Sequence, residues 1–239
     1  MQQNRERQSR EKRDMLSVYK DSVKIDDYTI EIFRGDSATD LSVIWLHTFP
    51  GEAEEIWERL SGISTLLAVT GNDWNRQFSP WPASKAFRQG EDFGGGAPDY
   101  LKYFLETLLP GAEEKLPFEP KVRGLAGYSM AGLFAVYAMY NTPVFNRIAC
   151  MSGSLWFDNW KEYALTHSPV PENPAVYLSL GSKEHKTKDQ RMSQVKTITE
   201  ELAVYWGKSC RVTYETVPGG HFTNVAQRIA RGITQIEKM

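Results

Sequence analysis

A serine stands at an abrupt junction between two apolar segments in the middle of the chain. Residues 122–127 have the pattern of a buried strand, and residues 130–141 have the pattern of a buried helix, with Ser129 at the turn between them. A helix that starts this close to a strand requires small residues at the contact and a strained backbone at the turn. Gly127 meets that requirement, whereas Ala131 adds a methyl group. The junction therefore restricts the chain to folds in which a strand and a helix pack tightly around one turn.

Strand-like and helix-like segments alternate from residue 41 onward. The strands are expected at residues 41–46, 63–69, 122–127, 147–152, 175–180 and 209–217, and the helices at residues 52–60, 98–109 (ended by Pro110), 130–141, 194–206 and 224–238. Two earlier strands, at residues 16–24 and 28–33, are expected to pair through a tight turn. The pattern predicts an α/β fold with a doubly wound, mostly parallel sheet and an N-terminal antiparallel edge.

The length and composition are typical of one globular domain. The chain has 239 residues, of which 41% are hydrophobic and 24% charged, and can bury one sizeable core. Residues 1–15 are interpreted as a polar N-terminal arm, and residues 16–239 as a single domain. The arm has no apolar segment of the kind found in signal peptides, and no apolar run is long enough to span a bilayer. We therefore expect a cytoplasmic protein that does not bind membranes.

Charge and cysteine content exclude several classes of partner and cofactor. The formal net charge is −2, which gives no indication of a nucleic-acid partner. Cys150 and Cys210 lie in strand-like surroundings and are expected to be buried reduced thiols. No Cys/His cluster has the spacing of a zinc site, and no cofactor is expected. Nothing in the sequence indicates an oligomeric state.

Three residues with catalytic chemistry occur in the order Ser129, Glu184, His221, each soon after a predicted strand. The carboxyl ends of parallel strands lie at one edge of a sheet, so these side chains are expected to meet there. A serine hydroxyl is a weak nucleophile until a neighbouring base takes its proton, and an acid must orient that base. The order of the three residues is the order found in α/β-hydrolases. His221 follows two glycines and is the predicted base.

Other residues compete for the roles of base and acid. His47 ends a predicted strand and is interpreted as a core or supporting residue, and the polar surroundings of His167 and His185 are typical of a surface. Two acids, Asp158 and Asp189, are alternatives for the residue that orients the base, and the sequence leaves this choice open.

Attack by such a serine on a carbonyl group also requires fixed N–H donors for the oxyanion. Met130 follows the serine at a helix N-terminus, so its backbone N–H is one predicted donor. The second is expected in the loop after the strand at residues 41–46, from Thr48 or, next, Phe49.

The segment at residues 71–97 is long, aromatic and rich in glycine. Segments of this length without regular structure are uncommon and often carry function, so it is either one wall of a substrate cleft or an irregular cover over the core. The candidate substrate-binding residues are Trp74, Trp81 and Phe93, together with Trp156 from a later loop.

Several motifs together resemble one esterase family of the α/β-hydrolases, which includes esterase D-type and ferric-siderophore esterases. The similar stretches are LHTFPGE at 46–52, DW…SPWPA at 73–83, FGGGAPDYLKYFLETLLP at 93–110, GYSMAGL at 127–133, SGSLWF at 152–157, YLSLGSKE at 177–184 and GGHF at 219–222. The chain departs from the family pattern at Ala131 and Thr48, where glycine is common.

The resemblance implies a serine esterase that cleaves a small-molecule carboxylic ester. It matches Ser129 and His221 to the nucleophile and base, Met130 and Thr48 to the oxyanion donors, and Glu184 less securely to the acid. Two narrower alternatives follow: a siderophore or macrolactone esterase, or a hydrolase-fold binding protein that has lost its activity.

Overall fold

The computed structural model describes residues 19–34, 41–60, 64–86 and 89–239. The predicted arm at residues 1–15 and the first residues of the strand predicted at 16–24 lie outside these ranges.

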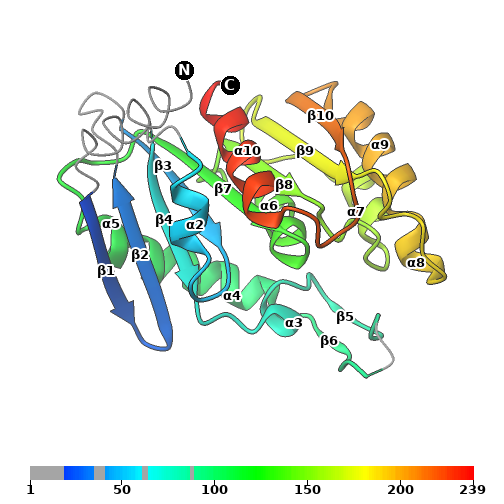
Figure 1. The fold of residues 1–239 in the computed structure, drawn as a ribbon, viewed down its shortest axis with the longest axis horizontal. Coiled ribbons are helices and arrows are strands. Elements are labelled where there is room, and N and C mark those ends of the chain that lie inside the picture. Colours follow the sequence, from blue (N-terminus) through cyan, green and yellow to red (C-terminus); the bar gives the residue numbers. More distant parts are fainter. Residues whose placement is uncertain (1–18, 35–40, 61–63, 87–88) are drawn as a thin grey trace, which may run out of the picture.

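An eight-stranded sheet crosses the molecule in the order β1-β2-β4-β3-β7-β8-β9-β10 (Figure 1). From β4 to β10 all neighbours are parallel, and β1 and β2 add the predicted antiparallel edge. The strands are β1 (Tyr19–Ile25), β2 (Tyr28–Arg34), β3 (Ser42–His47), β4 (Thr65–Thr70), β7 (Val122–Tyr128), β8 (Arg147–Met151), β9 (Ala175–Gly181) and β10 (Arg211–Val217). This topology confirms the fold class predicted from the alternation of apolar segments.

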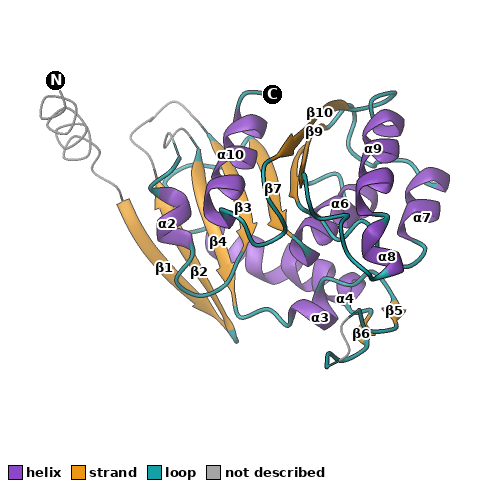
Figure 2. Ribbon diagram, turned by 45° about the vertical axis from the view of Figure 1, so that its right-hand side comes forward, coloured by secondary structure: helices purple, strands orange, loops and turns teal. Residues whose placement is uncertain are grey.

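Helices cover both faces of this sheet (Figure 2). One face carries α2 (Ala53–Trp57) and α10 (Val225–Glu237). The other face carries α4 (Ala97–Tyr103), η1 (Phe104–Leu108), α5 (Leu109–Glu113), α6 (Met130–Asn141), α7 (Trp160–Thr166) and α9 (Val195–Trp206). Two short helices, α3 (Trp74–Gln77) and α8 (Gln190–Ser193), and a two-stranded sheet of β5 (Pro82–Ala83) and β6 (Phe93–Gly94) lie in the connections.

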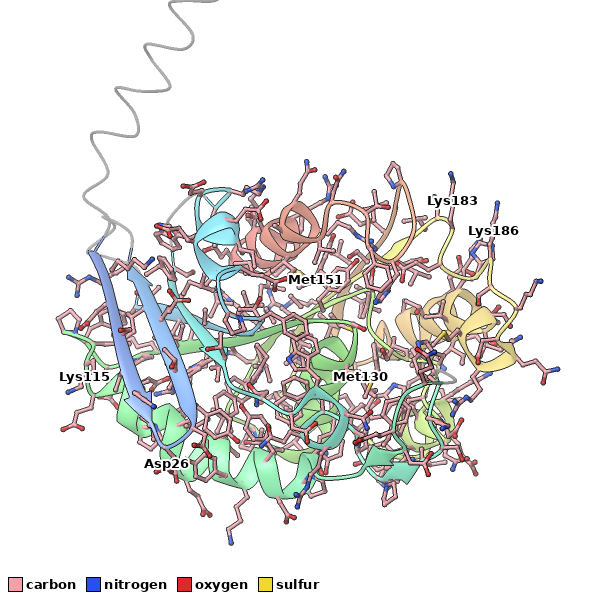
Figure 3. All side chains as sticks on the ribbon, turned by 60° about the horizontal axis from the view of Figure 1, so that its bottom comes forward. Asp26, Lys115, Met130, Met151, Lys183 and Lys186 are labelled. Atoms are coloured by element: carbon pink, nitrogen blue, oxygen red, sulfur yellow. The ribbon has the colours of Figure 1, made fainter. Side chains whose placement is uncertain are left out.

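The burial of each element follows from its sequence pattern. β3 and β4 read as continuous apolar runs, and every residue in them is buried. α6 is apolar on all sides and is buried from Met130 to Tyr140. Met151 at the end of β8 lies in the interior, whereas Lys183 points outward from the loop after β9 (Figure 3). Within the described residues, no helix is both long and apolar enough to cross a membrane.

The predicted helix end at Pro110 is wrong, because the helical segment runs from Ala97 to Glu113. It passes through a π-helical turn, in which the Leu109 N–H donates to the Phe104 carbonyl five residues earlier. Pro110 lies directly after this turn as the second residue of α5, and its fixed φ suits a helix there although it donates no N–H. Helices α3, α7 and α8 were not predicted, since runs of four to seven residues carry too little periodicity.

Candidate active site

The turn between β7 and α6 holds Ser129 in a strained conformation. Its φ is 58° and its ψ −121°, a region that residues with a side chain rarely occupy. A Cβ at Gly127 would lie 2.2 Å from the Ala131 carbonyl oxygen, so only glycine fits there. The methyl group of Ala131 is itself fully buried in the core. The tightest contact of the turn therefore falls on Gly127, and the departure from the family pattern at Ala131 is accommodated.

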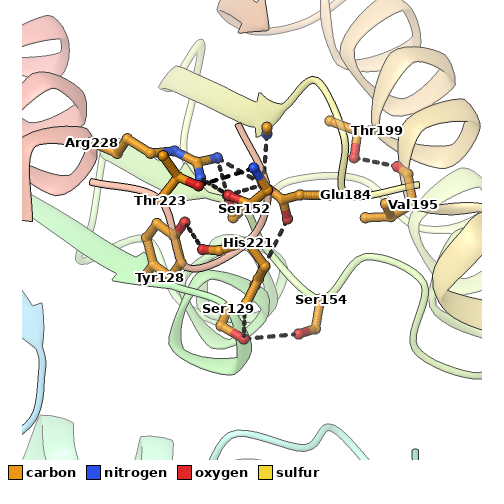
Figure 4. A network of polar contacts seen from close by, with 12 residues as sticks. Tyr128, Ser129, Ser152, Ser154, Glu184, Val195, Thr199, His221, Thr223 and Arg228 are labelled. Carbon is orange, nitrogen blue, oxygen red and sulfur yellow. Dashed lines mark hydrogen bonds and ion pairs between the residues drawn. The ribbon is translucent and has the colours of Figure 1, made fainter. Parts of the chain in front are cut away.

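A continuous hydrogen-bonded path joins Ser129, His221 and Glu184 at the carboxyl edge of the sheet (Figure 4). The Ser129 Oγ lies 3.1 Å from His221 Nε2, and His221 Nδ1 lies 2.8 Å from Glu184 Oε2. The Tyr128 hydroxyl donates to the His221 carbonyl at 2.6 Å and fixes the loop that carries the imidazole. These distances lie within the range over which a serine, a base and an orienting acid act together.

Glu184 is an ionised carboxylate with an unusually complete set of donors. Its Oε1 accepts from the Gly181 N–H and the Ser152 hydroxyl at 2.6 Å each, and from Arg228 Nη2 at 2.8 Å. Burial raises the pKa of this group, but the hydrogen bonds from His221, Arg228 and Ser152 outweigh burial and lower the pKa from 4.5 to about 2. Glu184 therefore keeps its negative charge beside His221 over the whole ordinary pH range.

Arg228 of α10 contacts three of the segments that carry this path. Besides Glu184, it donates from Nη1 to the Gly220 carbonyl in the His221 loop at 3.1 Å, and its guanidinium lies 5.3 Å from the centre of the Tyr128 ring. Only 4% of its side chain is exposed. Arg228 was not predicted from the sequence, although a signal was available: it occupies a position on the apolar stripe of α10, where a charge requires a buried partner.

Two serines from the loop after β8 also border the site. Ser152 has a φ of 47° and bridges Glu184 and Arg228 through its hydroxyl group. Ser154 Oγ lies 3.5 Å from Ser129 Oγ, and the Ser154 N–H donates to the Ser129 carbonyl at 3.0 Å. The sequence grouped these residues only as part of the SGSLWF stretch and assigned them no role.

The structure contradicts one of the two predicted oxyanion donors. The Thr48 N–H donates to the Val69 carbonyl at 3.1 Å, so it is already used in the contact between β3 and β4. The alternative, the Phe49 N–H, donates to Glu52 Oε2 at 3.2 Å. Met130 is different: it is the first residue of α6, so its N–H has no acceptor within the helix. The prediction of Thr48 was wrong because the sequence indicates where the loop after β3 lies but not which hydrogen bonds its backbone makes.

The competing acids lie elsewhere. Asp158 Oδ2 pairs with Arg191 Nη1 at 3.0 Å, and Asp189 caps α8 by accepting from the Arg191 and Met192 N–H groups. Neither contacts His221 in the described structure, which leaves Glu184 as the acid beside the imidazole.

The other histidines have structural surroundings. His47 Nε2 lies 2.7 Å from the Tyr100 hydroxyl, and burial among aromatic rings lowers the pKa of His47 to about 3. His167 stacks on Tyr163 at the end of α7. His185 is partly buried, so it is less exposed to solvent than the surface position that its polar surroundings indicated.

A cavity of about 580 Å³ opens above Ser129 and His221. Three of the four aromatic residues proposed for substrate binding, Trp74, Phe93 and Trp156, line it. The fourth, Trp81, does not: its Nε1–H donates to the Asp158 carbonyl at 2.9 Å, and its ring packs against the side chains of α7 and the residues before it. The aromatic segment at residues 71–97 thus supplies both a cleft wall and a structural cover.

Comparison with known proteins assigns the chain to a family. The family described as "Putative esterase" matches residues 61–223. The chain belongs to this esterase family. The description of this family agrees with the motifs that first indicated a serine esterase.

A curated relative, "Uncharacterized protein YbbA" of Bacillus subtilis (strain 168), is 34% identical over 126 residues. The match covers 52% of this chain and spans half the length of that relative.

Solved structures confirm the α/β-hydrolase fold. The siderophore hydrolase EstB from Aspergillus nidulans has a TM-score of 0.68 and 20% identity, with 92% of this chain and 95% of that chain covered. An IroE-like serine hydrolase from Shewanella oneidensis has a TM-score of 0.72 and 16% identity, with 92% of this chain and 79% of that chain covered. The "Enterobactin and Salmochelin Hydrolase IroE" has a TM-score of 0.65 and 16% identity, with 94% of this chain and 96% of that chain covered. At these identities the likeness shows the shared fold.

Proposed function

We propose that this esterase cleaves carboxylic esters through an acyl-enzyme on Ser129. His221 Nε2 takes the hydroxyl proton as Ser129 Oγ attacks the ester carbonyl, and then returns that proton to the departing alcohol. A water molecule, deprotonated by the same nitrogen, releases the acid and restores the serine. The observation that carries the proposal is the path from Ser129 through His221 to Glu184, with distances of 3.1 and 2.8 Å, beneath a cavity that admits a small molecule.

Glu184 is proposed to orient the imidazole and to stabilise its protonated form. Its low pKa supports this role, because a carboxylate that stays charged attracts the imidazolium formed during attack. The Met130 N–H is proposed as one donor to the oxyanion, since it lines the cavity at the N-terminus of α6.

The cavity supports a compact ester whose buried part is neutral and apolar. Trp74, Phe93 and Trp156 supply flat apolar surfaces, and among the described lining residues Lys183 is the one lysine or arginine. Lys183 and Glu91 are exposed and of opposite sign, and the Glu184 charge is paired with Arg228, so no single charge dominates the cavity. All strands of the larger sheet come from residues 19–217, which supports the proposal that residues 16–239 form one domain.

The test is labelling with a fluorophosphonate probe together with turnover of a p-nitrophenyl ester. The wild type should be labelled and active, Ser129→Ala should show neither property, and Ser22→Ala, an exposed serine of β1, should match the wild type. Unchanged turnover in Ser129→Ala refutes the proposed nucleophile. A wild-type protein that is neither labelled nor active would favour the inactive binding protein.

A second candidate, a siderophore or macrolactone esterase, is favoured by the aromatic walls of the cavity. The lack of a basic cluster in the described lining counts against a strongly anionic ferric complex. Incubation with metal-free and ferric forms of a trilactone siderophore separates the two proposals. Linear products from either form would support the second candidate, and intact trilactone in both would eliminate it.

A further inference from the structure

One arginine outside the catalytic path joins three separate segments around the cavity. Arg191 belongs to the short helix α8, whose start is fixed by the Asp189 carboxylate accepting from the Arg191 N–H at 2.9 Å. Its guanidinium donates to two consecutive main-chain carbonyls, from Nη1 to Ser84 at 2.9 Å and from Nη2 to Lys85 at 2.5 Å. The two acceptors lie just after β5, more than a hundred residues earlier in the chain.

The same guanidinium holds the loop that follows β8. Nη1 also pairs with Asp158 Oδ2 at 3.0 Å, and the guanidinium carbon lies 5.7 Å from the centre of the Trp156 ring. Five donors in a planar fork allow arginine to satisfy two carbonyls and a carboxylate at once while stacking on an indole. Lysine, with one ammonium nitrogen, has no equivalent geometry.

Each segment held by Arg191 contributes a neighbouring residue to the cavity above Ser129. Met192 follows Arg191 directly, Ala86 follows Lys85, and Trp156 carries the stacked indole; all three line the cavity. Arg191 does not line it. It lines a second, more open cavity of about 620 Å³, which shares Trp156 with the first. The guanidinium therefore lies behind the cavity wall, where it can position lining residues without contacting a substrate.

We propose that Arg191 is a specificity-determining residue, which fixes the spacing of three cavity walls and so sets the affinity for esters large enough to reach them. The proposal rests on the proposed function, because the walls are those of the Ser129 cavity. Without the guanidinium, the segment after β5 loses two hydrogen bonds that join it to α8, and Trp156 loses its stacking partner. A large substrate must then order these walls on binding, whereas a small ester at Ser129 does not touch them.

The test compares two esters in Arg191→Met, which keeps an unbranched apolar side chain and removes the charge. The KM for 1-naphthyl butyrate should rise about tenfold, because wall ordering now accompanies binding. The kcat and KM for ethyl acetate, followed by titration of released acid, should stay within about twofold. Arg191→Lys should lie between Arg191→Met and the wild type. Arg59→Met, at an exposed arginine two residues after α2 on the opposite face of the sheet, changes the net charge equally and should leave both esters unaffected.

Hydrogen exchange tests the same inference without relying on catalysis. Peptides covering residues 82–86 and 89–94 should exchange about tenfold faster in Arg191→Met, while β7 keeps wild-type protection. Unchanged exchange in those peptides overturns the inference even if the wild type hydrolyses no ester. An equal loss of activity toward both esters overturns it as well, since that result assigns Arg191 to general stability. Lack of esterase activity in the wild type, with faster exchange in the variant, counts against the proposed function alone.

Discussion

Replacing Arg228 with methionine should destabilise the protein by leaving the Glu184 carboxylate buried beside fewer donors. Methionine keeps an unbranched apolar stem of similar shape, so the main change is the loss of one buried positive charge. The side chains of Arg228 and Glu184 are only 4% and 5% exposed, so water does not screen their interaction. Breaking a buried ion pair by removing one partner typically costs about 3–5 kcal/mol.

The structure places the expected effect at the lower end of that range. After the substitution Glu184 still accepts from the Gly181 N–H, the Ser152 hydroxyl and His221. The lowering of the Glu184 pKa from 4.5 to about 2 corresponds to about 3 kcal/mol, shared among all of its charged and polar donors. We therefore expect a decrease of about 3 kcal/mol in the free energy of unfolding at pH 7.

A double-mutant cycle separates this interaction from simple loss of packing. Urea denaturation is measured for the wild type, Arg228→Met, Glu184→Gln and the double variant. Because the double variant has no unpaired buried charge, its destabilisation should be at least about 1.5 kcal/mol smaller than the sum of the two single effects. Additive effects would refute the reasoning.

The pH dependence gives a second test of the same pair. The Glu184 carboxyl group has a lower pKa in the folded protein than in the unfolded chain, so its charged form stabilises the fold above pH 4.5. This stabilisation is lost as the pH falls toward 2. Between pH 5 and pH 3 the wild type should therefore lose more stability than Glu184→Gln, and equal losses would contradict the cited pKa.

Three further changes test other parts of the site. Glu184→Gln should lower kcat by about 10⁴-fold, as expected when a base is held in the wrong tautomer, while Asp158→Asn stays within about twofold; equal effects would return Asp158 as a candidate acid. Gly127→Ala should abolish soluble expression or lower the melting temperature by several degrees, because its Cβ would lie 2.2 Å from a backbone oxygen; a normal melting curve contradicts this packing. His47 has a pKa of about 3 when folded and 6.5 when unfolded, so the unfolded state gains a proton first as the pH falls and stability is lost below pH 6.5. Between pH 7 and pH 5 the wild type should lose about 2 kcal/mol more than His47→Gln in urea denaturation, and parallel curves would exclude His47 as a source of acid sensitivity.

The sequence predicted best those features that depend on local pattern. Buried parallel strands read as apolar runs, and the turn around Gly127 and Ser129 has a composition that few other structures require. The order Ser129, Glu184, His221 placed three side chains at one sheet edge, and the structure brings them within hydrogen-bond distance. Chain order and strand direction were sufficient for this step because parallel strands share an edge.

What the sequence could not supply depends on individual hydrogen bonds between distant segments. The Thr48 N–H donates to the Val69 carbonyl, and no local sequence pattern indicates which backbone donors remain free for a ligand. Arg228 was not predicted because the buried face of the last helix was identified from its apolar residues alone, and the partner of Arg228 lies 44 residues away. Pro110 was expected to end a helix because proline usually does so. The π-helical turn that accommodates it depends on packing, which the local sequence does not show.

The position of Arg228 on α10 also makes the completed site depend on the docking of the final helix. Ser129 lies in the middle of the chain, yet the arginine that contacts the acid, the His221 loop and the ring beside Ser129 comes from the final helix. An intermediate with α10 undocked would contain the strained turn without an assembled base and acid. Hydrolytic activity should therefore not appear in refolding experiments before α10 docks, so a partly folded chain without docked α10 should carry an inert serine.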